Sequence, residues 1–319
     1  MNILIISPKR VSHLDITKEH LSKIKEVDPS IEVTVVSDSA QAASHLPHAE
    51  VMVGVFRLLP PIKEAVNLKW VHGLGAGADA LEPAIINSPI LVSNSSGVAA
   101  IPIAEHILAF LFIFTKKLYV TFANQRQKNW EKQKLTELRD KTVLIVGLGH
   151  IGKETARLLS CLGVRVIAID APGKEKPRFL EEIGDVAELS TFLGKADFVV
   201  ICLPLTKETH HMFGEKEFKN MKSSAVLVNI GRGAIVNEKE LIEALENKVI
   251  AGAALDVQET EPLPKESPLW DMKNVVITPH HSSGSEKYMD RAIERFCLNL
   301  RAFFGGKSLL NLVDKSAGY

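Results

Sequence analysis

The stretch TVLIVGLGHIG, residues 142–152, constrains the fold of this chain more than any other feature. A strand-like run, Thr142–Val146, leads directly into Gly147, Gly149 and Gly152, and a helical pattern follows. In this G-x-G-x-x-G arrangement the first glycine permits a tight turn, and the second lets a pyrophosphate approach the backbone. The third allows the helix to pack closely on the strand, so that the N-terminus of the helix faces the phosphates.

The strand that follows the glycines supports a dinucleotide site. Residues 164–169 form an apolar strand that ends at Asp170, 23 residues after Gly147, where a carboxylate can accept from a ribose 2′-hydroxyl. The same carboxylate would repel a 2′-phosphate, so the sequence favours NAD over NADP. Three basic residues that follow Asp170 in the sequence can reach a phosphate and weaken this preference: Lys174, Lys176 and Arg178. A strand, turn and helix without a ligand is the alternative interpretation.

Charge and hydropathy exclude several classes of partner. Lys plus Arg and Asp plus Glu both number 38, so no net charge favours nucleic acid or an anionic membrane. The one membrane-like stretch, residues 98–114, is interrupted by Pro102, Glu105 and His106. The apolar run that remains, 107–114, is too short to span a bilayer. The N-terminus lacks the pattern of a secretory signal, so we expect a cytoplasmic protein.

Strand-like and helix-like stretches alternate in two series. In the first, apolar strands are expected at residues 2–6, 31–36, 51–55, 68–72 and 90–92, with helical stretches at 17–27 and 61–66. A long helical or irregular segment follows at 102–138, and then six strands at 143–146, 164–169, 198–202, 226–230, 250–255 and 275–278. An amphipathic helix is expected at 287–304. Alternation of this kind predicts parallel sheets with helices on both faces.

A second glycine-rich loop, GLGAGA at residues 73–78, also follows a strand. Its next strand ends in Ser93 and Asn94, so there is no acid to hold a ribose. We therefore expect this loop to offer backbone N–H groups to a small anion, as turns and helix N-termini do. The residues concerned are Leu74, Gly75, Ala76 and Gly77. A turn that needs glycine only for its backbone geometry is the alternative.

Three successive strands of the second series end in residues with acid–base or anion-binding chemistry. The strand at 226–230 leads into Arg232, the next ends at Asp256 before Glu259 and Glu261, and the third ends in TPHHSSGS, with His280 and His281. Parallel strands bring these ends to one edge of the sheet. An arginine can grip a carboxylate, a histidine can protonate a carbonyl oxygen, and a carboxylate can orient that histidine. This set is what hydride transfer to a 2-oxo acid requires; three unrelated loop residues are the alternative.

Seven motifs in order resemble those of the D-isomer-specific 2-hydroxyacid dehydrogenase family, over about residues 68–283. They are GLGAGAD, NSSG with AEH, GLGHIG, CLPLT with ET, NIGRGAIV, LDVQETEPL and TPHHSSGS. The resemblance implies Arg232 as the substrate arginine, His280 as general acid/base and Glu261 as its carboxylate partner. It also implies Asp256 near the nicotinamide carboxamide, and the 74–77 amides as receivers of the substrate carboxylate.

The resemblance further implies two doubly wound, parallel α/β domains and a homodimer formed through the first helices of the cofactor domain. A Rossmann cofactor domain, 100–284, is inserted into a flavodoxin-like substrate domain, 1–99 and 285–319. A buried intramolecular helix at 107–114 is the alternative to the dimer. The expected cofactor contacts are Gly147, Gly149, His150, Ile151, Gly152, Asp170, Cys202, Pro204, Thr209, Asn229, Ile230, Gly231, Arg232, Asp256 and His280.

The sequence thus predicts an NAD-dependent enzyme that interconverts a 2-oxo acid and a D-2-hydroxy acid, with no metal. Two departures from the family pattern, His150 in place of arginine and Ser96 in place of proline, leave phosphate contact and substrate specificity open. Arg57 is a candidate for a second substrate anion, with a solvated loop residue as the alternative. The same fold also serves nicotinamide-nucleotide-sensing corepressors, but this sequence has no long polar tail and keeps the Arg, Glu and His set.

Overall fold

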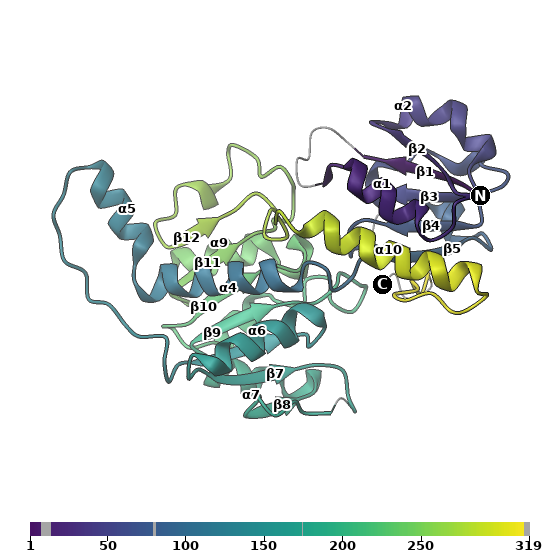
Figure 1. Ribbon diagram of the computed structural model, residues 1–319. Helices are drawn as coiled ribbons and strands as arrows, with labels where there is room; N and C mark the ends of the chain where they lie inside the picture. The colour runs from purple at the N-terminus through teal and green to yellow at the C-terminus, as the bar shows by residue number, and fades with distance from the viewer. Residues whose placement is uncertain (8–13, 79–80, 174, 316–319) are drawn as a thin grey trace. The chain divides into compact units, whose positions relative to one another are not determined.

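The structure is a computed structural model that describes residues 1–7, 14–78, 81–173 and 175–315. Lys174, a candidate phosphate contact, and Asp79 of the GLGAGAD motif lie outside the described residues. The chain forms two compact units, one of Met1–Ala99 with Gly284–Tyr319 and the other of Ala100–Ser283. Figure 1 labels the helices and strands of both units.

The first unit is built on a five-stranded parallel sheet with the order β2-β1-β3-β4-β5. This is the flavodoxin-like doubly wound order, as the sequence predicts. The strands are β1 (Asn2–Ile6), β2 (Glu32–Val36), β3 (Val51–Gly54), β4 (Trp70–Gly73) and β5 (Leu91–Asn94). Its α-helices are α1 (Lys18–Lys25), α2 (Ser39–Ala42), α3 (Pro83–Ile86) and α10 (Tyr288–Phe304).

Helix α10 belongs to this sheet although it comes near the end of the chain. Its apolar face, which includes Tyr288, Ile293, Phe296 and Leu300, is buried in one core with β1, β3 and β4. The predicted helical stretch at 61–66 is wrong: only a 3-10 turn, Ile62–Glu64, forms there. Such turns are used in short pieces because their hydrogen-bond geometry is poorer than that of an α-helix.

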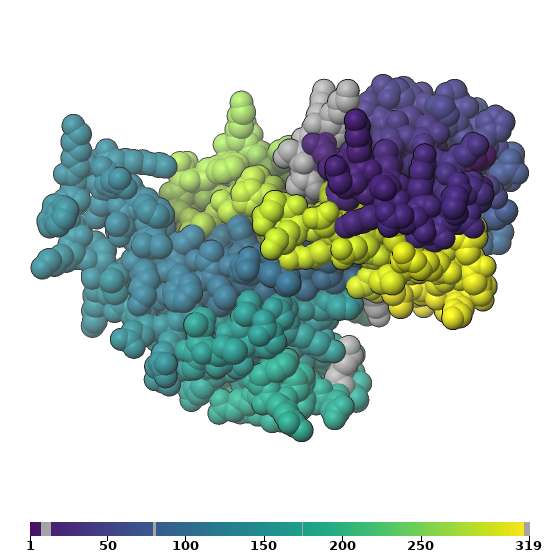
Figure 2. Space-filling view, viewed as in Figure 1, coloured from purple at the N-terminus to yellow at the C-terminus, as the bar shows by residue number. Residues whose placement is uncertain are grey.

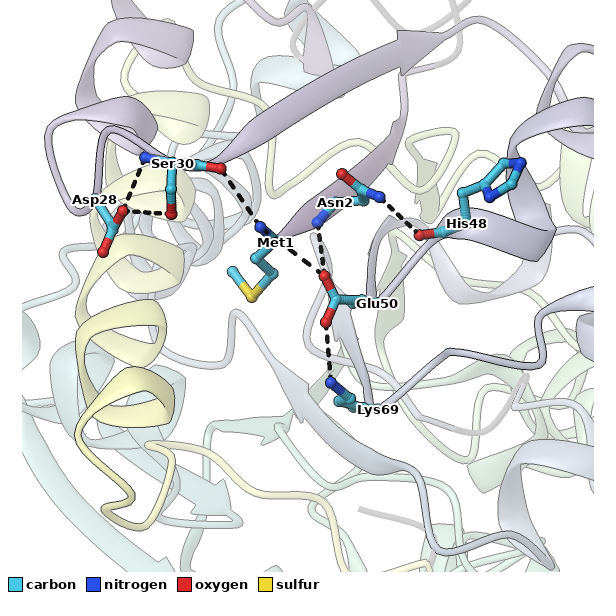
Figure 3. Close-up of polar contacts among 7 residues, drawn as sticks. All are labelled: Met1, Asn2, Asp28, Ser30, His48, Glu50 and Lys69. Carbon is cyan, nitrogen blue, oxygen red and sulfur yellow. Dashed lines mark hydrogen bonds and ion pairs between the residues drawn. The ribbon is translucent and has the colours of Figure 1, made fainter.

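Glu50 ties together the amino edge of the first sheet (Figure 3). Its carboxylate accepts a hydrogen bond from the backbone N–H of Asn2 at 3.0 Å and from Lys69 Nζ at 2.9 Å, and the N-terminal amine lies 3.9 Å away. These contacts join the starts of β1, β3 and β4. The opposite, carboxyl edge carries the loops with candidate binding groups.

The second unit is built on a seven-stranded parallel sheet with the order β12-β11-β10-β9-β6-β7-β8. This is the Rossmann order extended by one strand, which confirms the predicted fold class. The strands are β6 (Thr142–Val146), β7 (Arg165–Ile169), β8 (Glu182–Gly184), β9 (Phe198–Ile201), β10 (Val226–Asn229), β11 (Gly252–Leu255) and β12 (Val275–Ile277). Strand β8 was not among the six predicted, because its three residues, EIG, are partly exposed and carry little apolar signal.

The helices of the second unit are α4 (Ala100–Thr115), α5 (Leu118–Arg126), α6 (His150–Cys161), α7 (Leu189–Lys195), α8 (Glu215–Asn220) and α9 (Glu238–Glu246). Helix α4 packs against α6. The long segment predicted at 102–138 therefore contains two helices, and they are separated at Lys117, whose φ of 47° is left-handed.

Helix α5 and the segment after it form a protruding arm, residues 118–137, at the edge of this unit (Figures 1 and 2). The segment from 128 to 137 has almost no regular structure, and Trp130 within it is 96% exposed. Among the described residues, no single helix is long and apolar enough to cross a membrane. Helices α4 and α5 pass that test only as a pair, with a bend of 68° between them.

Candidate active site

The candidate residues of the second unit all follow the carboxyl ends of its strands. Gly147 follows β6, Asp170 follows β7 and Cys202 follows β9, while Arg232, Asp256 and His280 follow β10, β11 and β12. Because every strand in the sheet is parallel to its neighbours, these ends lie along one edge. That edge is where doubly wound sheets bind their ligands.

The glycine loop has the backbone geometry that a pyrophosphate needs. Gly147 has a φ of 102°, which favours glycine, and a Cβ on Gly152 would lie 2.0 Å from the carbonyl oxygen of Gly147. A Cβ on Gly149 would meet no described atom within 4 Å, so the backbone is open there. Gly149 is the N-cap of α6 and supplies no capping side chain. The backbone N–H groups at the helix N-terminus are therefore available to an anion. The loop therefore fits a dinucleotide.

Asp170 closes over the same loop. Its carboxylate accepts from the backbone N–H of Leu148 at 3.1 Å and from that of Ala171 at 2.7 Å. A cavity of about 340 Å³ borders this position and is lined by Leu148, Lys153, Glu175, Lys176, Pro177 and Arg178. An acid suited to a ribose and a group of basic residues thus lie at the same strand end.

Several of the remaining predicted cofactor contacts form hydrogen bonds with backbone groups of the loops along this edge. The Thr209 hydroxyl donates to the carbonyl oxygen of Pro204 at 2.8 Å. Asn229 accepts from the N–H of Gly231 at 3.1 Å and donates to the carbonyl oxygen of Arg232 at 3.0 Å. His150 and Ile151 lie in the first turn of α6, and Cys202 and Ile230 follow β9 and β10.

His280 and Glu261 form a hydrogen-bonded pair. The Nδ1 atom of His280 lies 2.8 Å from Oε2 of Glu261, and both side chains are partly exposed. Burial acts to raise the pKa of Glu261, but the hydrogen bond and charge of His280, a backbone bond from Gln258 and the charge of Arg232 together lower it. Glu261 is therefore a carboxylate at neutral pH, suited to orient and stabilise a protonated imidazole.

Arg232 lies in the turn after β10 and is only partly exposed. Its Nη1 donates to the carbonyl oxygen of Gly231 at 2.8 Å, and its charge acts on Glu261. The structure thus brings together the predicted arginine, glutamate and histidine at one sheet edge.

Asp256 is fully buried beside this group. Its carboxylate accepts from the hydroxyl of Thr278 at 2.6 Å and from the backbone N–H groups of His281 and Ser282, both at 3.1 Å. Burial acts to raise its pKa, but the bonds from Ser282, Thr278 and His281 lower it overall.

His106, Asp256 and His281 place three ligand-type atoms within 4.8 Å of one another, and this is the one such group among residues 1–7, 14–78, 81–173 and 175–315. Both carboxylate oxygens of Asp256 already accept hydrogen bonds. The geometry is that of a hydrogen-bond acceptor with its donors, so we assign no metal to it.

The glycine-rich loop of the first unit is held by its carbonyl groups. The carbonyl oxygen of Leu74 accepts from the Tyr288 hydroxyl at 2.7 Å, that of Gly75 from the N–H of Ser95 at 3.1 Å, and that of Ala76 from Asn94 Nδ2 at 2.7 Å. In a trans peptide the N–H points away from the carbonyl oxygen. The N–H groups of the three following residues, 75–77, therefore point away from these anchors. The prediction is wrong for Leu74, whose own N–H donates to the carbonyl oxygen of Gly54 at 2.8 Å. Arg57 lies on an exposed 3-10 turn of the same unit.

The sequence indicates no role for two polar residues of the second unit, His106 and Thr278, although both lie in the matched motifs AEH and TPHHSSGS. His106 lies on α4, and its Nε2 is 3.2 Å from Oγ1 of Thr278. The sequence signals for His106 were its place in the AEH motif and its interruption of an apolar stretch, and neither indicated a contact with Thr278.

Comparisons with known proteins agree with the predicted family. Residues 108–282 match the family model of the D-isomer specific 2-hydroxyacid dehydrogenase NAD binding domain. A glyoxylate reductase of Thermococcus litoralis is 34% identical over 306 residues, which cover 92% of this chain and 86% of that protein.

Solved structures are similar over the whole chain. A D-isomer specific 2-hydroxyacid dehydrogenase family protein from Aeromonas salmonicida has a TM-score of 0.88 and 28% identity, and the match covers 98% of this chain and 99% of that one. The NADPH-dependent glyoxylate/hydroxypyruvate reductase of Sinorhizobium meliloti, in complex with NADP and sulfate, has a TM-score of 0.84 and 29% identity, with 100% of both chains covered.

A Rossmann sheet with a glycine fingerprint at its first strand and an Arg, Glu and His set at its later strands defines a nicotinamide-dinucleotide dehydrogenase. The matched family model covers more than half of the 319 residues. The chain belongs to the D-isomer specific 2-hydroxyacid dehydrogenase family.

Proposed function

We propose that the protein reduces a 2-oxo acid to a D-2-hydroxy acid with NADH, and catalyses the reverse reaction with NAD. The observation that carries this proposal is the 2.8 Å contact between His280 and Glu261, with Arg232 close enough for its charge to lower the pKa of Glu261. An acid, its carboxylate partner and a cation for an α-keto carboxylate are the groups that this reaction needs.

Each residue has a separate role in this mechanism. When bound at the glycine loop, the reduced nicotinamide supplies the hydride that the carbonyl carbon accepts. Arg232 binds the substrate carboxylate and polarises the carbonyl group. His280 donates a proton to the carbonyl oxygen, and Glu261 orients the imidazole and stabilises its protonated form. In the first unit, we propose the N–H groups of Gly75, Ala76 and Gly77 as donors to an anion.

For the cofactor we propose NAD. The support is Asp170, which lies at the end of β7 against the glycine loop and would repel a 2′-phosphate. The opposing observation is the cavity with Lys153, Lys176 and Arg178, together with similar structures that contain NADP or NADPH. The ratio of kcat/KM with NADH to that with NADPH decides between them.

For the substrate we propose a small 2-oxo acid of the glyoxylate and hydroxypyruvate class. The support is that several relatives are glyoxylate reductases, at 34–36% identity. Arg57, exposed on its turn, is a candidate for a second anion, which would extend the range to phosphohydroxypyruvate or a dicarboxylate.

The experiment is a steady-state screen with NADH and glyoxylate, hydroxypyruvate, phosphohydroxypyruvate, pyruvate and longer branched oxo acids. Turnover of glyoxylate or hydroxypyruvate by the parent, lost in His280→Ala, is the expected result. Turnover of none of them would favour the corepressor function on the same fold. An Arg57→Ala variant with an unchanged KM for the best substrate would remove the second-anion role.

We also propose that the protein is a homodimer that uses the arm, residues 118–137, and the apolar helix α4. The support is the exposure of Trp130 and Phe122 on the arm, at 96% and 52%. Large exposed aromatic side chains are typical anchors of protein interfaces.

A further inference from the structure

A line of hydrogen-bonded side chains connects helix α4 with the loop that carries His280. Nε2 of His106 lies 3.2 Å from Oγ1 of Thr278, and the Thr278 hydroxyl donates to Oδ1 of Asp256 at 2.6 Å. A hydroxyl has one hydrogen, and here Asp256 accepts it, so the Thr278 oxygen must accept from His106. The inferred tautomer of His106 therefore carries its proton on Nε2.

Asp256 holds the loop after β12 through both its backbone carbonyl group and its side chain. Its backbone carbonyl oxygen accepts from the N–H of His280 at 2.8 Å, and its carboxylate accepts from the N–H groups of His281 and Ser282. His280 has a φ of 49°, in the left-handed region that is costly for a residue with a Cβ. The surrounding contacts must therefore hold this conformation, and Asp256 makes three of them.

We propose that His106 is a positioning residue that acts through Thr278 and Asp256 to keep the backbone of residues 280–282 in the conformation that presents His280 to Glu261. The catalytic consequence rests on the proposed dehydrogenase function, whereas the backbone consequence does not. His106 touches none of the reacting groups named above.

The surroundings of His106 agree with a neutral N–H donor. Its side chain is 20% exposed, and the groups that face it are Phe110 on its own helix, at 4.5 Å between ring centroids, and Asp256 and His281 from the strand ends. Burial lowers the pKa of His106, the charge of Asp256 opposes this shift, and His281 adds to it. At neutral pH the imidazole is uncharged and keeps the Nε2 hydrogen that Thr278 accepts.

Hydrogen exchange on the substrate-free protein tests the backbone part of the proposal. In His106→Leu the N–H groups of residues 280–282 should exchange roughly 2- to 12-fold faster, the range expected for one lost hydrogen bond. In His106→Gln, whose side-chain amide can donate in place of Nε2, exchange should stay near the parental rate. The N–H groups of β10 serve as an internal reference, and His45→Gln, at an exposed position of the other unit, as a matched control.

A general loosening of the fold would raise exchange in β10 as well, so local acceleration separates positioning from a loss of stability. Parental exchange at residues 280–282 in His106→Leu would overturn the proposal. So would equal acceleration in the Leu and Gln variants, because donation to Thr278 would then not matter.

A double-mutant cycle tests the route through Thr278. His106→Leu should lower kcat roughly 3- to 10-fold with the KM of the oxo acid little changed, since the loss is in the placement of His280. Thr278→Val should have at least as large an effect, because it also removes the hydroxyl that donates to Asp256. The double variant should be no worse than Thr278→Val alone. Additive effects would overturn the route. If no oxo acid is turned over by the parent, the proposed function fails, while the exchange result still decides whether His106 positions the loop.

Discussion

Gly233 and Gln258 meet backbone to backbone: a Cβ on Gly233 would lie 1.9 Å from the carbonyl carbon and oxygen of Gln258. This contact packs the turn that carries Arg232 closely against the loop that carries Glu261. This backbone contact therefore helps to set the spacing between the arginine and the carboxylate.

Gly233→Ala should therefore disturb both loops. The new methyl group meets backbone atoms that cannot rotate away, so we expect a loss of about 1–3 kcal/mol in the free energy of unfolding and a fall in kcat of at least about tenfold. Gly194→Ala in α7 is the matched control. Its Cβ would come no closer than 3.7 Å to Asn220, and we expect it to stabilise the protein by about 0.4–1 kcal/mol. Chemical unfolding measures the free energy of unfolding, and steady-state kinetics measure kcat. Parental values of both for Gly233→Ala would contradict the close backbone contact between Gly233 and Gln258.

Glu261→Gln should remove the negative charge beside His280 while keeping the size of the side chain. We expect kcat to fall about 10²-fold or more, because the imidazole loses the group that stabilises its protonated form. When Glu261→Gln is combined with His280→Ala, kcat should fall little below that of His280→Ala alone, since the two residues act as a unit. Glu266→Gln, at an exposed position of the same loop, should leave kcat unchanged.

The pH dependence provides a second check on Glu261. Its pKa lies below the ordinary value of 4.5, so the carboxylate stays ionised through neutral and mildly acid pH. The contribution of its charge is present above that value and is lost only as pH falls through the lowered pKa. A Glu261 carboxyl carbon that titrates above pH 4.5 by NMR would contradict this assignment.

Asp170→Ala should shift the cofactor preference towards NADPH. With NADH we expect kcat/KM to fall about tenfold, because the ribose loses its acceptor, and with NADPH we expect it to rise, because the repulsion is removed. Arg178→Ala is the complementary variant, which lowers kcat/KM with NADPH alone if the basic cavity reads a phosphate. A parental preference for NADPH of about tenfold or more would show that Asp170 does not govern the choice.

Much of this architecture could be predicted because the signals are local. Apolar strands that end in Asp170, Arg232, Asp256 and His280 are readable one at a time, and parallel order then places their ends together. Strand β8 could not be predicted, since three partly exposed residues carry too little hydrophobic pattern.

Contacts between residues far apart in the sequence could not be predicted either. His106 and Thr278 are 172 residues apart, and only the packing of α4 shows that they are neighbours. The contact of Gly233 with Gln258 is also invisible in sequence, where the glycine is explained equally well by a turn. Periodicity reports which face of an element is buried, but not which side chain it meets there.

Trp130→Ser should weaken the proposed homodimer. An aromatic anchor at the centre of an interface typically contributes 2 kcal/mol or more, so the dissociation constant should rise roughly 30-fold. Val66→Ser is the matched control, because Val66 is another exposed apolar residue, at 80%, on the other unit. Light scattering across a dilution series measures both. A parent that is monomeric at high micromolar concentration, or a Trp130→Ser protein that dimerises like the parent, would remove this role of the arm.

His72 should make the first unit less stable in acid. It lies on β4, fully buried, with Nδ1 2.8 Å from the hydroxyl of Ser93 and Nε2 3.2 Å from that of Ser95. Burial, helped by the charge of Arg295, lowers its pKa from 6.5 to about 3. Between these values the unfolded chain binds a proton that the folded chain does not, so stability is complete above about pH 6.5 and falls as pH decreases.

The slope expected from His72 alone is about 1.4 kcal/mol per pH unit across that window. His72→Gln should be less stable at pH 7 but should lack this part of the acid dependence, whereas His45→Gln, at an exposed position, should keep it. Trp70 can report on the first unit if the other two of the three tryptophans, Trp130 and Trp270, are replaced by phenylalanine in all variants. Urea unfolding at pH 4.5 to 7.5 then gives the slopes. Equal slopes in the parent and His72→Gln would mean that the buried imidazole is protonated in the folded state.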